Sequence, residues 1–113
     1  MNLENLRQEL ITLEAGFCAA LSDPSRLLIL YSLKEGLKNV SELSAELNIT
    51  QPNISKHLKI LKEKGLVISS KNGTQVNYDL ADPRLIEAMD LLRTIMRDQL
   101  QKRSIIINHT TPL

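Results

Sequence analysis

The chain has 113 residues, 42% of them hydrophobic and 24% charged, which is the composition of one globular domain spanning residues 1–113. No apolar run approaches the roughly 20 residues that a membrane-spanning helix needs, and no apolar block follows Met1 as in a signal peptide, so we expect a cytoplasmic protein with no membrane partner. A single cysteine, Cys18, excludes an intramolecular disulfide, and two tyrosines with one phenylalanine argue against RNA-binding modules that stack bases on aromatic rings.

The formal net charge of +1 conceals an uneven distribution along the chain. Residues 51–78 contain five lysines and one acidic residue, Glu63. A local basic segment in a nearly neutral chain indicates contact with a polyanion. A lysine-rich helix face that meets only solvent would give the same count, so charge alone leaves both interpretations open.

The first two predicted elements are helices. Leucines recur at every third or fourth position near the N-terminus, which predicts an amphipathic helix over about 3–16. Asp23 is a good N-cap and Pro24 suits a first helical turn, so a second helix should begin there. Gly36 supplies its C-terminal stop.

Two short helices follow, separated by a turn of only three residues. We expect Ser41 to cap the first of them, which should end near Leu47 with Asn48 in the left-handed conformation. Thr50 should cap the second helix of the pair, and Gly65 should end it. The pair, over about 41–64, therefore predicts a helix-turn-helix.

The hydrophobic period then changes from that of a helix to that of a strand. Apolar residues alternate with polar ones in the second half of segment 66–80, and Asn72-Gly73 is a strong signal for a two-residue hairpin turn. A last helix should cover about 83–103. This order predicts a winged helix-turn-helix, a mainly α fold (α+β) in which a small β-hairpin forms the wing.

The second helix of such a pair enters the major groove of DNA, so its outward residues should contact bases or phosphates. Gln51 and Asn53 carry amides that can bond to adenine, while Lys56 and Lys59 can reach guanine or phosphate, and Ser55 is short enough for close approach. An ordinary polar helix face is the alternative. The predicted DNA contacts are Thr50, Gln51, Pro52, Asn53, Ser55, Lys56, His57, Lys59, Lys71, Thr74 and Gln75.

Two of these residues have a second interpretation. His57 precedes the apolar Leu58, so it either donates to DNA or lies at the border of the helix and bonds within the fold, and we favour the border slightly. Lys71 at the wing tip either contacts a phosphate or the minor groove, or is a solvated turn lysine.

Several segments together carry a specific resemblance. They are 21–27 (LSDPSRL), 40–43 (VSEL), 50–58 (TQPNISKHL), 65–67 (GLV) and 73–78 (GTQVNY). In combination they resemble the ArsR/SmtB family over roughly residues 15–100. The resemblance implies a homodimeric winged-helix repressor that covers a palindromic operator and is released by an effector. The family's recognition-helix contacts fall on Gln51, Pro52, Ser55 and Lys56.

The chain departs from the family's metal-sensing members. Asn39, Ser41 and Ser44 stand where arsenic- and cadmium-type members place cysteines. The last helix has Asp90 and Asp98 but lacks the histidine of zinc- and nickel-type members. Soft metals need thiolates, and zinc usually needs three or four ligands, so we expect no metal site and no cofactor.

Cys18 reads first as a small buried hydrophobe near the start of the second helix. Alternatively, it is a redox residue that pairs with Cys18 of a second subunit, or the protein senses a small ligand. No Ser-His-Asp set, glycine-rich phosphate loop or histidine pair is visible in the sequence, so we expect no enzyme.

Apolar stripes on the first and last helices predict a homodimer. The last helix has a second stripe, Ala88, Leu91 and Ile95, so one face can pack on its own core while the other needs a partner. A single chain that wraps both faces is the alternative. A winged-helix module that binds proteins and not DNA is a further alternative. The predicted interface residues are Leu3, Leu6, Leu10, Leu13, Leu85, Met89, Leu92, Met96 and Leu100.

Overall fold

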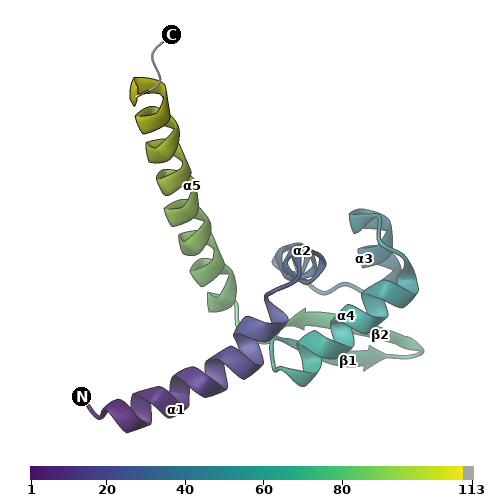
Figure 1. Cartoon of the computed structure of the whole chain (residues 1–113). Coiled ribbons are helices and arrows are strands. Elements are labelled where there is room, and N and C mark those ends of the chain that lie inside the picture. Colours follow the sequence, from purple (N-terminus) through teal and green to yellow (C-terminus); the bar gives the residue numbers. More distant parts are fainter. Residues whose placement is uncertain (111–113) are drawn as a thin grey trace. The chain divides into compact units, whose positions relative to one another are not determined.

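The computed structural model describes residues 1–110 and, within that range, the side chains of residues 1–104. Met1–Asp82 forms one compact unit, and a second unit begins at Pro83. The elements are α1 (Leu3–Leu13), η1 (Glu14–Cys18), α2 (Pro24–Leu33), α3 (Val40–Leu47), α4 (Gln51–Glu63), β1 (Val67–Asn72), β2 (Gln75–Leu80) and α5 (Arg84–Thr110). The predicted fold class, a mainly α fold with a small β-hairpin, is confirmed. Between α4 and α5 the chain forms a two-stranded antiparallel hairpin, and its other elements are helical (Figure 1).

The core of the first unit lies between α2, α3, α4 and the hairpin. In the first unit, α4 contacts α2, α3 and β1, and α2 also contacts β2. Figure 1 shows α1, in purple, leading away from this cluster, and α1 buries none of its residues. The largest fully buried side chains are Ile29, Leu30, Leu33, Leu43, Ile54, Leu58, Leu61 and Val67.

Helix α2 begins as predicted, but the cap of α3 was wrongly predicted. The Asp23 side chain accepts hydrogen bonds from the backbone N–H groups of Ser25 and Arg26, which confirms it as the cap of α2. Asn39, two residues before Ser41, caps α3. Its Oδ1 accepts from the N–H of Glu42 at 2.8 Å, and Oε1 of Glu42 accepts from the N–H of Asn39 at 3.1 Å. This reciprocal pair satisfies two free N–H groups, which a cap at Ser41 would not do.

The turn between α3 and α4 has the predicted conformation. Asn48 has φ 55°, in the left-handed region, and Thr50 Oγ1 accepts a 3.4 Å hydrogen bond from the N–H of Asn53. Ser44 Oγ donates to the carbonyl of Ile49, whose N–H donates back to the Ser44 carbonyl at 3.3 Å. These bonds hold the start of α4 against α3.

The hairpin turn lies one residue later than predicted. Asn72 pairs with Gln75, so Gly73 and Thr74 form the loop. Gly73 has φ 66°, the positive value that a two-residue loop of type II′ requires at its first position. Lys38 also pairs with Tyr78 of β2 through two backbone hydrogen bonds, 3.1 and 2.8 Å long, which joins the start of α3 to the wing.

Two further differences concern the ends of helices. The first helix continues through the π-helical turn η1, so Cys18 lies at the end of that helix and not at the start of the next. Cys18 is exposed, which contradicts its interpretation as a buried hydrophobe. Helix α5 extends to Thr110, beyond the predicted end near 103, because no glycine or proline interrupts residues 84–110. None of the helices within residues 1–110 is both long and apolar enough to cross a bilayer.

A polar cluster at the surface end of α2 and α3 centres on the Lys38 ammonium. Nζ donates to Glu46 Oε2 at 2.6 Å, to Ser32 Oγ at 2.9 Å and to Glu35 Oε2 at 3.4 Å. Ser32 is only 4% exposed, and its hydroxyl donates to Glu46 at 2.7 Å. Hydrogen bonds from Lys38 and Ser32 lower the pKa of Glu46, and the bond to Glu46 raises the pKa of Lys38. The cluster therefore joins α2 to α3 through ionised groups.

We expect Glu46→Gln to lower the urea midpoint near neutral pH, and the difference from the wild type to shrink in acid. A lowered pKa means that ionised Glu46 stabilises the fold fully above its ordinary value of 4.5. That contribution is lost as the pH falls through the folded-state value. Glu35→Gln is the control, because its longer bond predicts a smaller effect. Parallel pH profiles for Glu46→Gln and the wild type would contradict the assignment.

Candidate nucleic-acid interface

Helix α4 has one buried face and one polar exposed face. Ile54, Leu58 and Leu61 are fully buried against the core, and Thr50 caps the first turn. This packing leaves most of the remaining positions of the helix exposed to solvent. The predicted contacts that the structure leaves exposed on this helix and its cap are Thr50, Gln51, Pro52, Asn53, Ser55, Lys56 and Lys59.

The wing adds a second exposed polar segment. Lys71, Thr74 and Gln75 are all exposed at the tip of the hairpin. Behind the tip, Lys62 Nζ of α4 donates to Ser69 Oγ of β1 at 2.7 Å, so the wing is bonded to α4 as well as to Lys38. The wing is therefore attached to α4 by a side chain and to the start of α3 by backbone pairing.

The lysines on this surface are available to bind anions. In the described part of the chain, Lys56, Lys59 and Lys71 have no carboxylate within ion-pair distance. Glu63 is the one acidic residue within segment 51–78. An exposed ammonium without a local counterion is a favourable contact for a phosphate group.

His57 lies at the border of α4, as the slightly favoured interpretation predicts. It is half-buried, and its Nδ1 lies 3.4 Å from Nη1 of Arg26. The same guanidinium donates through Nε to the carbonyl of Ala20 at 2.7 Å. Arg26 thus joins the end of the first helix to α4, a role that no local sequence pattern indicated.

Arg26 also contacts the cap of its own helix. Its Nη1 lies 3.9 Å from Oδ2 of Asp23. Desolvation acts to raise the pKa of Asp23, but hydrogen bonds from the N–H groups of Ser25 and Arg26, together with nearby positive charge, lower it below its ordinary value. Ionised Asp23 therefore stabilises the start of α2, which carries Arg26.

Gln51, one of the predicted DNA contacts, lies within hydrogen-bond distance of a side chain of α3. Gln51 Nε2 lies 3.3 Å from Ser41 Oγ, and Ser41 also lines a small surface hollow with residues from the start of β2. Sequence reasoning missed this use of Ser41, because the two residues lie on different helices. The hollow is lined by Asn39, Val40, Ser41, Gln75 and Val76.

Three positions at which the sequence resemblance places the metal-binding cysteines of other members have structural roles here. Asn39 caps α3, Ser41 contacts Gln51, and Ser44 holds the turn to α4. Within the described residues, no group of three or more His, Cys, Asp or Glu side chains lies close enough together to hold a metal ion. Asn39, Ser41 and Ser44 thus offer neutral atoms that are already hydrogen-bonded.

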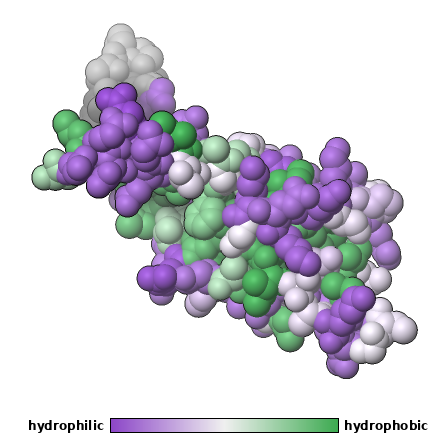
Figure 2. Space-filling model, turned by 90° about the horizontal axis from the view of Figure 1, so that it is seen from below, coloured by the Kyte–Doolittle hydropathy of each residue, from purple (hydrophilic) through white to green (hydrophobic). Residues whose placement is uncertain are grey.

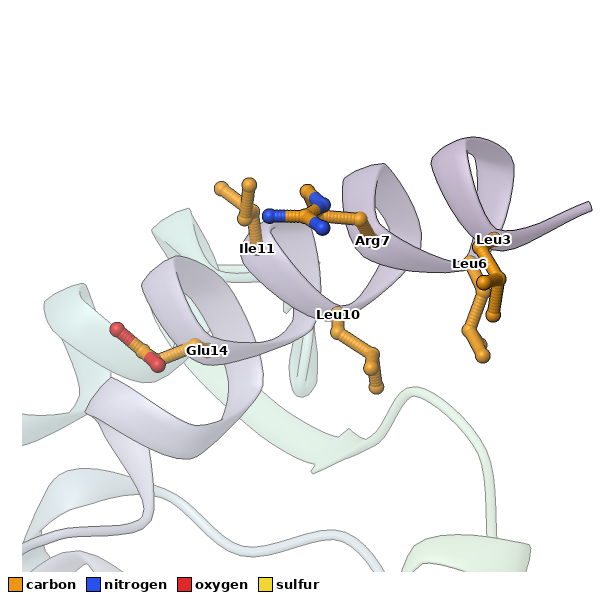
Figure 3. Close-up of a pocket in the computed structure, with 6 residues that line it drawn as sticks. All are labelled: Leu3, Leu6, Arg7, Leu10, Ile11 and Glu14. Atoms are coloured by element: carbon orange, nitrogen blue, oxygen red, sulfur yellow. The ribbon is translucent and has the colours of Figure 1, made fainter.

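Leucines are exposed along α1. Leu3 is 71% exposed, Leu10 and Leu13 are also exposed, and Leu6 is half-buried. Figure 3 shows Leu10 and Ile11 pointing to different sides of the helix. Figure 2 shows apolar residues, in green, reaching the surface of the molecule among hydrophilic ones. Exposed leucines on a helix that buries no residue indicate an interaction surface. The open groove along the helix is lined by Leu3, Leu6, Arg7, Leu10, Ile11 and Glu14 (Figure 3).

Helix α5 changes character along its length. Leu85 is half-buried and Met89 is only 6% exposed, whereas Leu92 is 65% exposed and Met96 and Leu100 are exposed as well. The exposed apolar surface therefore begins after Met89. It also includes residues of the second stripe, namely Leu91 and Ile95.

Comparisons with known proteins agree with this geometry. Residues 23–69 match the family model for bacterial regulatory proteins of the arsR family. The chain is 40% identical to the transcriptional regulator CmtR of Mycobacterium tuberculosis over 78 residues, which are 68% of this chain and 66%, just under two thirds, of CmtR. It is 34% identical to the biofilm growth-associated repressor of Xylella fastidiosa over 85 residues, 75% of each chain.

One solved structure is similar to this chain in fold. It is the homodimeric winged helix-turn-helix DNA-binding domain of Mb0332 from Mycobacterium bovis. It matches this chain with a TM-score of 0.74 and 25% identity, covering 85% of this chain and 89% of that domain.

Proposed function

Since the chain belongs to the bacterial ArsR family of DNA-binding transcriptional regulators, we propose that it is a repressor that binds a palindromic operator as a homodimer. The family is not one of enzymes. The observation that carries the proposal is the exposed polar face of α4, whose Lys56 and Lys59 have no carboxylate within ion-pair distance among the described residues. That surface has the charge and residue types that a DNA groove requires.

The residues divide into two roles. Gln51 and Asn53, in the first turn of α4, are proposed to read base edges through their amides. Lys56, Lys59 and Lys71 are proposed to bind phosphates, which sets orientation and affinity without reading sequence. Repression follows because a dimer that covers the operator excludes other proteins from the same DNA. Thr50, Pro52, Ser55, Thr74 and Gln75 complete the proposed contact surface. His57 is left out of it, because its Nδ1 lies 3.4 Å from Arg26 Nη1 at the border of α4.

The proposed dimer uses the apolar surfaces of α1 and α5. The Mb0332 domain is described as homodimeric, and both helices of this chain carry exposed apolar rows. Two copies of α4 in such a dimer would enter successive major grooves about one helical turn apart. Met89 and Leu85 have less free surface for a partner than Leu92, Met96 and Leu100.

Cys18 supports a second candidate function, that of a thiol-oxidation sensor. A redox-sensing thiol must be accessible to its oxidant, and Cys18 is exposed. The DNA-binding surface is the same in both functions, and only the signal that releases the operator differs. A winged-helix module that binds proteins alone would not need Lys56, Lys59 and Lys71, which meet no carboxylate within ion-pair distance in the described part of the chain.

The first DNA prediction separates base reading from positioning. Gln51→Ala should weaken operator binding by about 1–3 kcal/mol and relax preference at one base position. Lys71→Ala should weaken binding to all sequences alike and reduce the salt dependence by about one in log–log slope. Gel-shift titrations of operator and random duplexes over a salt series measure both effects. Equal losses on both DNAs for both variants would contradict the assigned roles, and no binding at low salt would exclude the repressor.

The dimer prediction concerns Leu92, at 65% exposed. Leu92→Asp would place an unpaired carboxylate in the proposed interface, so the dimer dissociation constant should rise at least about tenfold, equivalent to 1.4 kcal/mol. Sedimentation equilibrium measures it. Gln101→Asp is the control, since it adds the same charge at a polar exposed position of α5. An intact dimer of Leu92→Asp that still binds operator would place the interface elsewhere.

We expect metals to leave operator binding unchanged within about a few-fold, because Asn39, Ser41 and Ser44 offer no thiolate. Micromolar zinc, cadmium, nickel or arsenite would be added to gel shifts of the wild type. Cys18→Ser is the matched control, because it removes the one thiol. A stoichiometric metal that lowers affinity a hundredfold, a coupling of about 2.7 kcal/mol, would contradict this expectation.

A further inference from the structure

Gln51, the first residue of α4, is bonded to a different helix. Its Nε2 lies 3.3 Å from Oγ of Ser41, the second residue of α3, and both side chains are exposed. Among the predicted base-reading amides, Asn53 has no such side-chain contact within the described residues. The Gln51 amide therefore has a hydrogen-bond partner within the protein, whereas the Asn53 amide has none among the described residues.

We propose that Ser41 is a positioning residue that fixes the orientation of the Gln51 amide and thereby makes Gln51 selective for adenine. The inference rests on the proposed function, in which α4 reads base edges. Ser41 itself need not touch a base. It acts by deciding which atoms of the Gln51 side chain face the groove.

The selectivity follows from the hydrogen-bonding capacity of a carboxamide. The Gln51 amide has one acceptor, Oε1, and two N–H donors on Nε2. Donation to Ser41 through the hydrogen that points away from Oε1 leaves Oε1 beside the remaining N–H. That acceptor–donor pair matches the N6 amino group and N7 of adenine. Guanine offers two acceptors at the same edge, O6 and N7, and so leaves Oε1 without a donor.

The backbone around Ser41 is rigid enough for this role. The capping box between Asn39 and Glu42 fixes the first turn of α3, in which Ser41 lies. The bonds between Ser44 and Ile49 fix α3 relative to the start of α4. The distance from the Ser41 hydroxyl to the Gln51 backbone is therefore set by the fold, and the bond orders a side chain that would otherwise lose rotamer freedom on binding DNA.

The position of Ser41 also places it within the proposed DNA surface. It lines the same surface hollow as Gln75, a predicted contact at the start of β2. Ser41 thus lies between the first turn of α4 and the wing. A polar residue that served only to begin α3 would not be needed here, since Asn39 already caps that helix.

The test compares base preference at the operator position that Gln51 reads, identified as the position where Gln51→Ala loses discrimination. Operator duplexes with each of the four bases at that position are titrated with wild type, Ser41→Ala and Ser41→Thr. We expect Ser41→Ala to lower the adenine-to-guanine affinity ratio about fivefold or more. Ser41→Thr, which retains the hydroxyl, should keep the wild-type ratio. Binding to random DNA should be the same for all three proteins.

A double-mutant cycle shows whether the effect passes through Gln51. In the Gln51→Ala background, Ser41→Ala should cause no further change in base preference or affinity. A loss that persists in that background, or a Ser41→Ala protein with the wild-type ratio, would overturn the inference and leave the proposed function intact. Wild-type protein that shows no sequence-specific binding would overturn the proposed function and this inference together.

Discussion

The turn between α3 and α4 is the constraint on which the proposed DNA surface depends. Asn48 occupies the left-handed region at φ 55°, which is unusual for a residue other than glycine, and it ends α3 so that the chain changes direction within three residues. The reciprocal bonds of Ser44 and Ile49 then hold that conformation. Because Thr50 caps α4 directly after the turn, the direction of α4 and the rotation of its polar face are both set here.

Helix α3, more than α4, connects the parts of this surface. Lys38, two residues before α3 begins, pairs with Tyr78 of the wing through its backbone and with Glu46 of α3 through its ammonium. Ser41 of α3 contacts Gln51 of α4. Bonds from Lys38, just before α3, and from Ser41 within it therefore reach the wing and the first turn of α4, so a change in the position of this segment would move both predicted DNA contacts together.

Features with a local signal were predictable from the sequence. The Asp23 and Thr50 caps and the left-handed Asn48 each follow from a few neighbouring residues, and each is confirmed. The errors arise where two residues compete for the same helix cap, or where the pairing of strands decides the position of a turn. Asn39 takes the cap from Ser41 because Glu42 can reciprocate, and cross-strand register moves the hairpin turn by one residue. Contacts between distant segments leave no periodic pattern, so Arg26 with His57 and Ser41 with Gln51 could not be anticipated.

The stability of helix α1 has a different source from that of the other helices of the first unit. The helix that begins with α1 runs without a break through η1 to Ala20, and α1 itself buries none of its side chains. Most of the stability of a helix in a protein comes from packing of its apolar face, so packing must supply most of the stability of α1. In the proposed dimer the exposed leucines of α1 obtain that packing from the interface. Formation of α1 and association of the protomers would then stabilise each other, and operator affinity would depend on protomer concentration as well as on the contacts of α4.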